Sequence, residues 1–190
     1  MLVDDSIIEG CVAGRRSAQS ALYRKYASVM LAICMRYAKN RDEAEDILQE
    51  AFLKIFQNIE SYRKEGSFEG WMKRIMINHA LNFYRRSKKQ PFLEDIESIN
   101  ENDIMDKEEP QASHAPVSAE RLTALIQMLP PGYRMVFNMY VFEEYSHKEI
   151  STELSISENT SKTQLLKARR MLRKKLYDLN LVNNTVLANE

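Results

Sequence analysis

Seven basic side chains, with no acidic one among them, lie between residues 162 and 175: Lys162, Lys167, Arg169, Arg170, Arg173, Lys174 and Lys175. In a helix, which turns by about 100° per residue, two sides can be separated. One side carries Thr163, Leu166, Lys167, Arg170 and Lys174. The other carries Ser161, Leu165, Ala168 and Leu172. We expect the second side to pack, and the first to neutralise phosphates while its first turn reaches base edges.

A shorter helix is expected just before this one. Ile150 and Leu154 lie four residues apart, and the apolar pattern then breaks over residues 155–157. Ser157 is suited to cap the second helix by accepting from the amides near residues 159 and 160. A basic helix end can also reflect only a favourable interaction with the helix dipole, or a solvated face. The short helix, the break and the cap favour a DNA-binding helix-turn-helix.

Composition limits what the rest of the chain can be. The 190 residues are 44% hydrophobic, which is enough for one sizeable core or two small ones. The net charge is zero, but residues 1–90 carry 16 basic and 11 acidic side chains, residues 91–119 carry 1 and 8, and residues 120–190 carry 10 and 8. Two mildly basic blocks therefore flank an acidic middle segment.

Several classes of protein are disfavoured. Cys11 and Cys34 form no CxxC pair, and no Cys/His cluster has zinc spacing, so we expect no metal and no cofactor. The first residues do not resemble a signal peptide and no run of 18 apolar residues occurs, so we expect a soluble, cytoplasmic protein without a membrane segment. Only five glycines and no strand-like alternation favour an all-α fold.

The first block of the chain is expected to be helical. Within residues 5–38, an apolar residue recurs every fourth position at Leu22, Tyr26, Met30 and Cys34. Asp42 is suited to cap the next helix. That helix has an apolar side made of Ile47, Leu48, Ala51, Phe52 and Ile55. Its opposite side carries Glu43, Asp46, Glu50 and Lys54.

A loop over residues 60–67 leads to a further helix that begins near Phe68. Apolar residues available for packing are Phe68, Trp71, Met72, Ile75 and Leu81. Spacings of three and four place a polar band along this helix, made of Arg74, Asn78, Asn82, Arg85 and Arg86.

The sequence therefore predicts two small helical domains joined by a flexible acidic linker. The first domain spans residues 1–90, and the linker spans residues 91–118, where three prolines and an excess of acids leave little to bury. A four-helix bundle that ends in the helix-turn-helix spans residues 119–178. Residues 179–190 are expected to be a frayed tail.

Four features of the chain together carry a resemblance to a known family. DILQEAFLKIF (residues 46–56), FEGWMKRIMINHALNFYRR (residues 68–86), an acidic linker and a C-terminal unit ending ISENTSKTQLLKARRML together resemble the extracytoplasmic-function sigma factors of bacterial RNA polymerase. The DxxQExF pattern is met by Asp46, Gln49, Glu50 and Phe52. The resemblance extends from about residue 21 to residue 176 and implies a sigma region 2 bundle followed by a sigma region 4 helix-turn-helix.

The resemblance implies a non-enzymatic role in transcription initiation. It implies that core RNA polymerase is bound through the clamp helices of its largest subunit by Asp46, Gln49, Glu50 and Phe56. It also implies contact with the flap of the second-largest subunit, with promoter DNA, and with an anti-sigma factor that holds the protein inactive. An acidic ridge of Glu43, Asp46 and Glu50 suits a basic partner helix, although it is also compatible with a solvated face.

DNA contacts follow from the same resemblance. The minus-ten residues would be Arg63, Lys64, Ser67, Arg74, Asn78, Asn82, Arg85 and Arg86. The minus-thirty-five residues would be Lys162, Thr163, Gln164, Leu166, Lys167 and Arg170. The sequence departs from the family where Ser155 and Asn159 replace glycine, Ser161 replaces a β-branched apolar residue and Gln164 replaces arginine.

Two alternatives remain at this stage. A conventional helix-turn-helix regulator would use residues 1–90 as a sensor or dimerisation domain and would bind duplex DNA unaided. An enzyme is disfavoured, because Glu144 and His147 form only half of a di-iron motif and no other histidine has a glutamate three residues before it.

Overall fold

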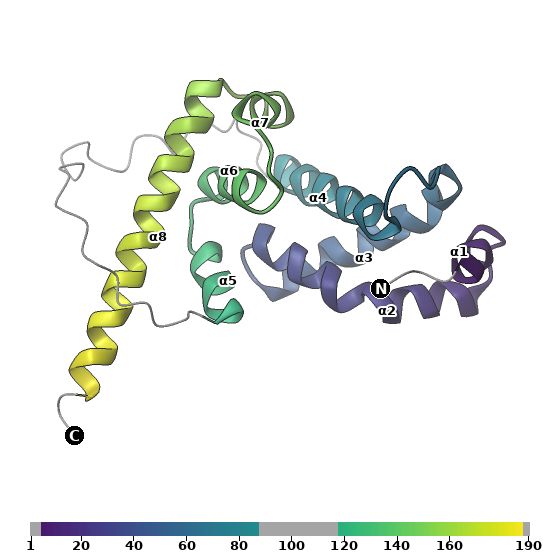
Figure 1. The fold of residues 1–190 in the computed structure, drawn as a ribbon, viewed down its shortest axis with the longest axis horizontal. Coiled ribbons are helices and arrows are strands. Elements are labelled where there is room, and N and C mark those ends of the chain that lie inside the picture. The colour runs from purple at the N-terminus through teal and green to yellow at the C-terminus, as the bar shows by residue number, and fades with distance from the viewer. Residues whose placement is uncertain (1–4, 88–117, 188–190) are drawn as a thin grey trace. The chain divides into compact units, whose positions relative to one another are not determined.

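Residues 5–87 and 118–187 are described by the computed structural model, and all regular structure within them is helical. The all-α prediction is thus confirmed for these ranges. The chain divides into two compact units, residues 1–88 and 89–190, which are described separately (Figure 1). The expected linker, residues 91–118, lies outside the described residues except for Ser118. No helix of the described ranges is both long and apolar enough to cross a membrane.

The first unit is built from helices α1 to α4 and one short 3₁₀ helix. The bounds are Asp5–Val12 for α1, Arg16–Tyr37 for α2, Arg41–Asn58 for α3, Ile59–Ser61 for the 3₁₀ helix η1 and Phe68–Ser87 for α4. Helices α2, α3 and α4 pack on one another (Figure 1). The predicted apolar stripe of α2 and the apolar side of α3 are both buried, which confirms them as core. This core fixes which sides of α3 and α4 remain exposed.

The N-terminus of α3 differs from the prediction. Asn40, not Asp42, is the N-cap: it has an extended backbone, and its side-chain oxygen accepts a hydrogen bond from the Glu43 amide at 2.9 Å. The helix begins at Arg41, so Asp42 lies in the first turn. A carboxylate there still interacts favourably with the helix dipole, although it does not cap.

Both cysteines of the first unit are buried and free. Cys34 is completely buried in α2, and its thiol lies 4.0 Å from the sulfur of Met76 in α4. Burial raises the pKa of Cys34 to about 12, and it also raises the pKa of Cys11. Both groups are protonated thiols at neutral pH, and they contribute to packing as small apolar side chains.

The second unit contains α5 (Ala119–Gln127), α6 (Pro131–Val141), α7 (His147–Leu154) and α8 (Glu158–Leu187). Helix α8 packs on both α6 and α7. The cap predicted for it is confirmed, because the Ser157 hydroxyl accepts from the Thr160 amide at 3.0 Å. Helix α8 continues to Leu187, so the expected tail at residues 179–190 is helical over most of its length. The basic run therefore lies in the middle of one long helix.

Helix α7 is capped at both ends, and its C-terminal cap forms the turn into α8. Ser146 and Glu149 form a reciprocal capping box at the start of α7. The helix ends at Leu154, and the C-cap residue Ser155 has a left-handed backbone (φ 55°) that reverses the chain. Glycine adopts this conformation without strain, whereas an L-residue such as serine does so at a cost of about 1–2 kcal/mol. The described residues thus confirm the predicted helix-turn-helix, with some strain at the turn.

Candidate functional site

The outward side of α3 combines carboxylates with an exposed leucine. Asp46, Gln49 and Glu50 are exposed and Phe56 is half-buried, as the predicted polymerase-binding side requires. Leu53 is 61% exposed and was not expected on this side. Its position seven residues after Asp46 places it in the same stripe, and that spacing could have identified it. An apolar group surrounded by polar ones is a common composition for a protein interface.

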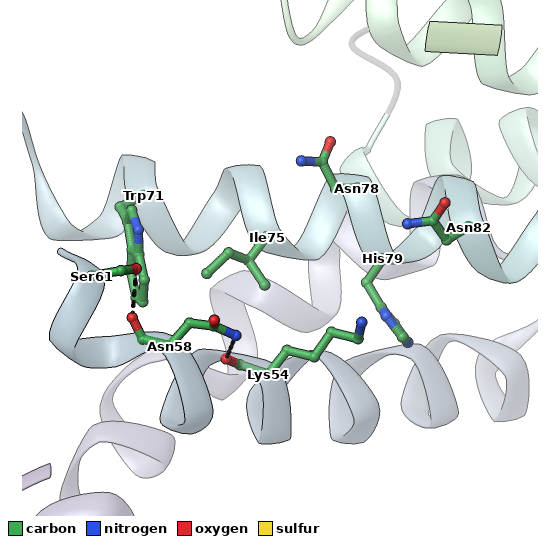
Figure 2. Close-up of a pocket in the computed structure, with 8 residues that line it drawn as sticks. All are labelled: Lys54, Asn58, Ser61, Trp71, Ile75, Asn78, His79 and Asn82. Atoms are coloured by element: carbon green, nitrogen blue, oxygen red, sulfur yellow. Dashed lines mark hydrogen bonds between the residues drawn. The ribbon is translucent and has the colours of Figure 1, made fainter. Parts of the chain in front are cut away.

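The polar band of α4 is exposed throughout, as predicted. It contains Arg74, Asn78, Asn82, Arg85 and Arg86. Asn78 and Asn82 also line a pocket of about 290 Å³ between α4 and the end of α3 (Figure 2). The other lining residues are Lys54, Asn58, Ser61, Trp71, Ile75 and His79. Sequence periodicity did not indicate this pocket, because its two walls come from different helices.

The pocket has an apolar wall and a fixed polar rim. Trp71 stacks on Phe68 with ring centroids 5.4 Å apart and lies 5.7 Å from the Tyr62 ring. Trp71 is thus a packing anchor that also leaves part of its ring at the pocket. On the opposite wall the Asn58 side chain donates to the Lys54 carbonyl at 2.8 Å, and the Ser61 hydroxyl donates to the Asn58 carbonyl at 2.7 Å (Figure 2).

Three of the predicted minus-ten residues lie in the loop before α4, and they differ in the contacts that they make. Arg63 is exposed. Lys64 has a left-handed backbone (φ 59°) and lies 3.2 Å from Asp5, in an ion pair that solvent screens. The Ser67 hydroxyl accepts from the Gly70 amide at 3.0 Å, so it stabilises the start of α4. Of the three, Arg63 is the side chain with the fewest competing contacts.

One hydrogen bond joins the α3 side to the α4 pocket. The imidazole Nε2 of His79 lies 2.9 Å from a carboxylate oxygen of Glu50. Burial lowers the pKa of His79, while the hydrogen bond and the charge of Glu50 act in the opposite direction. Neither residue was paired with the other by sequence reasoning, because they lie on separate helices.

Five of the six residues predicted to contact the minus-thirty-five element are at least partly exposed on α8. Lys162, Thr163 and Leu166 are exposed, and Lys167 and Arg170 are half-buried. The apolar side Ser161, Leu165, Ala168 and Leu172 is buried, as predicted.

Gln164 is the exception, because it is only 3% exposed and does not join the outward side. Its amide lies against Gly132 of α6, where an added Cβ would come within 3.3 Å. Position 164 is three residues after Ser161 and four before Ala168, so the helical period already places it on the buried side.

The departure at Ser161 is compensated within the second unit. Ser161 is completely buried, and its hydroxyl lies 2.9 Å from Nδ1 of His147 in α7. The His147 ring also stacks on Tyr140 of α6, with centroids 4.8 Å apart. Burial lowers the pKa of His147, as do the nearby cations Lys162 and Arg169, while Glu158 raises it. A polar contact thus occupies a place where the resemblance to the family predicts an apolar one.

Comparisons with known proteins identify the family. The model of Sigma-70 region 2 matches residues 22–90, and the model of Sigma-70, region 4 matches residues 119–172. The ECF RNA polymerase sigma factor SigW of Bacillus subtilis is 31% identical over 173 residues, which cover 87% of this chain and 92% of that protein. The chain belongs to the extracytoplasmic-function sigma factors. Members of this family are transcription initiation factors rather than enzymes, and a conventional helix-turn-helix regulator is not favoured.

Other similarities extend over most of this sigma factor. The ECF RNA polymerase sigma-E factor of Haemophilus influenzae is 26% identical over 185 residues, covering 94% of this chain and 97% of that protein. A solved structure of the sigma factor RpoE from Bartonella quintana, in complex with the anti-sigma factor NepR, has a TM-score of 0.49 and 16% identity. It covers 84% of this chain and 96% of that one.

Proposed function

We propose that this sigma factor confers promoter specificity on core RNA polymerase through three surfaces: the outward side of α3, the pocket beside α4 and the outward side of α8. The pair of exposed amides at the α4 pocket carries the proposal. Asn78 and Asn82 stand beside an apolar wall and a row of arginines, a combination that suits an unpaired base and its backbone. The α4 pocket would belong to a region 2 domain within residues 1–90, and α8 to a region 4 domain within residues 119–178.

The α3 side is proposed to bind the clamp helices of the largest polymerase subunit. Asp46 and Glu50 supply negative charge that would steer and orient a basic partner. Gln49, Leu53 and Phe56 supply hydrogen bonding and apolar contact on the same side. This composition favours a protein partner over a nucleic acid, which would be repelled by the carboxylates.

The α4 pocket is proposed to receive a base of the minus-ten element after the strands separate. An extruded base can be recognised by hydrogen bonds to its edge and by packing against apolar side chains. Asn78 and Asn82 would supply the hydrogen bonds to the base edge, and Trp71 and Ile75 would supply the apolar packing. Arg63, Lys64, Arg74, Arg85 and Arg86 would hold the strand through its phosphates, and Ser67 would shape the loop.

The outward side of α8 is proposed to enter the major groove at the minus-thirty-five element. Lys162, Thr163 and Leu166 lie in its first turns, where base edges are reached in helix-turn-helix proteins. Lys167 and Arg170 follow and would contact phosphate. Gln164 would act indirectly, by setting how α8 packs on α6.

Further partners follow from the family alone. We propose contact with the flap of the second-largest polymerase subunit and inhibition by an anti-sigma factor, with the protein acting in the cytoplasm where polymerase is. Co-purification of the tagged protein from cells would identify an inhibitor.

Run-off transcription tests the proposed function. Purified protein and core RNA polymerase would be incubated with genomic fragments, with each component omitted in turn. Specific transcripts are expected only when both are present, and the protein alone should bind duplex fragments weakly. A protein that binds duplex sites tightly without polymerase and yields no transcript would contradict the proposal.

A further inference from the structure

His79 connects the proposed polymerase-binding side to the proposed base pocket. It lies on α4 between Asn78 and Asn82, and its ring points towards α3 whereas Asn78 points away from α3 (Figure 2). Its Nε2 atom lies 2.9 Å from Oε2 of Glu50. The histidine is 3% exposed, but the Glu50 side chain is 52% exposed. One end of this contact is therefore in the core, and the other reaches the surface.

The surroundings fix which nitrogen carries the proton. Among the described residues, His79 Nδ1 is buried and has no hydrogen-bond partner. A proton on Nδ1 would be a buried donor without an acceptor, and Nε2 would then face a carboxylate with its lone pair. Both consequences are unfavourable, so the neutral ring carries its proton on Nε2 and donates to Glu50.

The charge state of the pair follows from the same geometry. A doubly protonated ring would place an unpaired N–H at Nδ1 in the interior, which agrees with the lowered pKa of His79. Glu50 and Lys54 of α3 and Arg86 of α4 are the charged groups that act on it. The ring remains neutral near pH 7, so it adds no positive charge beside the Glu50 carboxylate. One carboxylate oxygen is held by α4, and the exposed part of the group remains available to a cation.

We propose that His79 is a positioning residue that orients the Glu50 carboxylate for RNA polymerase and links the polymerase-binding helix to the base-reading helix. This inference rests on the proposed role of α3. A surface glutamate without such a contact samples several rotamers and loses that freedom on binding. The hydrogen bond to His79 already restricts the Glu50 side chain in the free protein. Less conformational entropy is therefore lost when the docking side binds polymerase.

Matched substitutions at position 79 separate hydrogen bonding from packing. In His79→Gln, the side-chain amide can donate to Glu50, whereas His79→Leu fills similar space without a donor. We expect His79→Leu to weaken binding to core polymerase by about fivefold, the scale of one side chain that must be ordered on binding. His79→Gln should retain most of the wild-type affinity. Circular dichroism would confirm that both full-length variants are folded.

A double-mutant cycle with Glu50→Ala tests whether His79 acts through Glu50. Glu50→Ala alone should weaken polymerase binding, and adding His79→Leu should weaken it no further. Additive losses, or an unchanged affinity in His79→Leu, would overturn the inference while the docking role of α3 stands. If Asp46→Ala and Glu50→Ala both bind polymerase as the wild type does, the docking role fails and this inference fails with it.

A titration of the free protein gives an independent measurement. The His79 pKa can be followed by NMR in the wild type and in Glu50→Gln. Because Glu50 raises the pKa of His79, its removal should lower that pKa further. An identical titration in both proteins would show that the hydrogen bond is absent in solution and would overturn the inference, whatever the polymerase affinities.

Discussion

The two units present their proposed DNA-reading residues in different ways. In the first unit, Asn78 and Asn82 stand at a pocket whose opposite wall comes from α3. In the second, Lys162, Thr163 and Leu166 lie on the exposed side of a single helix. A concave site built from two helices suits one separated base, whereas a convex helix side suits the groove of an intact duplex. In the proposed function, each surface therefore suits a different state of the promoter.

The same difference predicts how far the effect of a mutation should extend within each unit. A change on α3 can reach the pocket through the packing of α3 on α4, so the proposed polymerase-binding and base-reading sites should be coupled. The exposed side of α8 depends on its own turn and on α6. Five substitutions test this difference, taken from the largest expected effect to the smallest.

Charge reversal on α3 should have the largest effect. Asp46→Lys combined with Glu50→Lys replaces attraction to a basic partner by repulsion, and we expect core polymerase affinity to fall about 100-fold, or ~3 kcal/mol. Fluorescence anisotropy of labelled protein with core enzyme measures this. The second unit should retain its amide hydrogen-exchange protection, and an unchanged affinity would count against docking through α3.

Removing one amide at the pocket should impair strand opening. Asn78→Ala is expected to cost about 2 kcal/mol of base recognition, seen as weaker permanganate reactivity of the promoter at equal occupancy by holoenzyme. Asn58→Ala is the matched control, because Asn58 lines the same pocket but its amide donates to the Lys54 carbonyl. Equal strand opening by Asn78→Ala and the wild type would show that Asn78 does not contact the base.

The buried Gln164 should affect stability rather than base preference. Gln164→Ala leaves space against Gly132, and we expect the second unit to lose about 1–2 kcal/mol of unfolding free energy. Amide hydrogen exchange of α7 and α8 measures the loss in the full chain. Leu166→Ala, on the exposed side, should instead change promoter binding with little effect on exchange. A changed base preference in Gln164→Ala at unchanged stability would restore Gln164 to the DNA contacts.

Lys167 should contribute through charge. Lys167→Ala is expected to weaken promoter binding by holoenzyme about fivefold and to lower the salt slope by about one unit. Lys167→Arg keeps the charge and should keep the slope. A wild-type slope in the alanine variant would mean that Lys167 does not contact phosphate.

The smallest effect is expected at the strained turn. Ser155→Gly removes the cost of a left-handed serine but adds freedom to the unfolded chain, so the net gain should be about 0.5 kcal/mol. Slower hydrogen exchange of the α7 amides would show this gain in stability. Ser155→Ala keeps the strain and should give no gain, and equal exchange in both variants would argue that the turn is unstrained.

Sequence reasoning was most successful where one helix decides the outcome. The buried and exposed sides of α8 follow from its period alone, and the same period applied to position 164 would have placed Gln164 inside. The core stripe of α2 was found in the same way. What periodicity does not contain is the neighbour across a helix interface, and so the α4 pocket and the contact between His79 and Glu50 were missed.

Capping illustrates a second limit. Asn40 and Asp42 both suit a helix start by residue type, and the choice depends on where the chain leaves α2 rather than on local preference. Leu53 illustrates a third limit. The apolar side of α3 already contains enough residues for the core, so a further apolar residue on the exposed side is easily missed.

The two shielded thiols make the protein convenient to label. Burial raises the pKa of Cys34 to about 12 and also raises the pKa of Cys11, so both thiols are protonated and unreactive at pH 7. Maleimide dyes should therefore react with a single cysteine introduced on an exposed site, without replacement of either native residue. A second introduced cysteine would place a donor on one unit and an acceptor on the other, and energy transfer would then report how the distance between the dyes changes when polymerase binds.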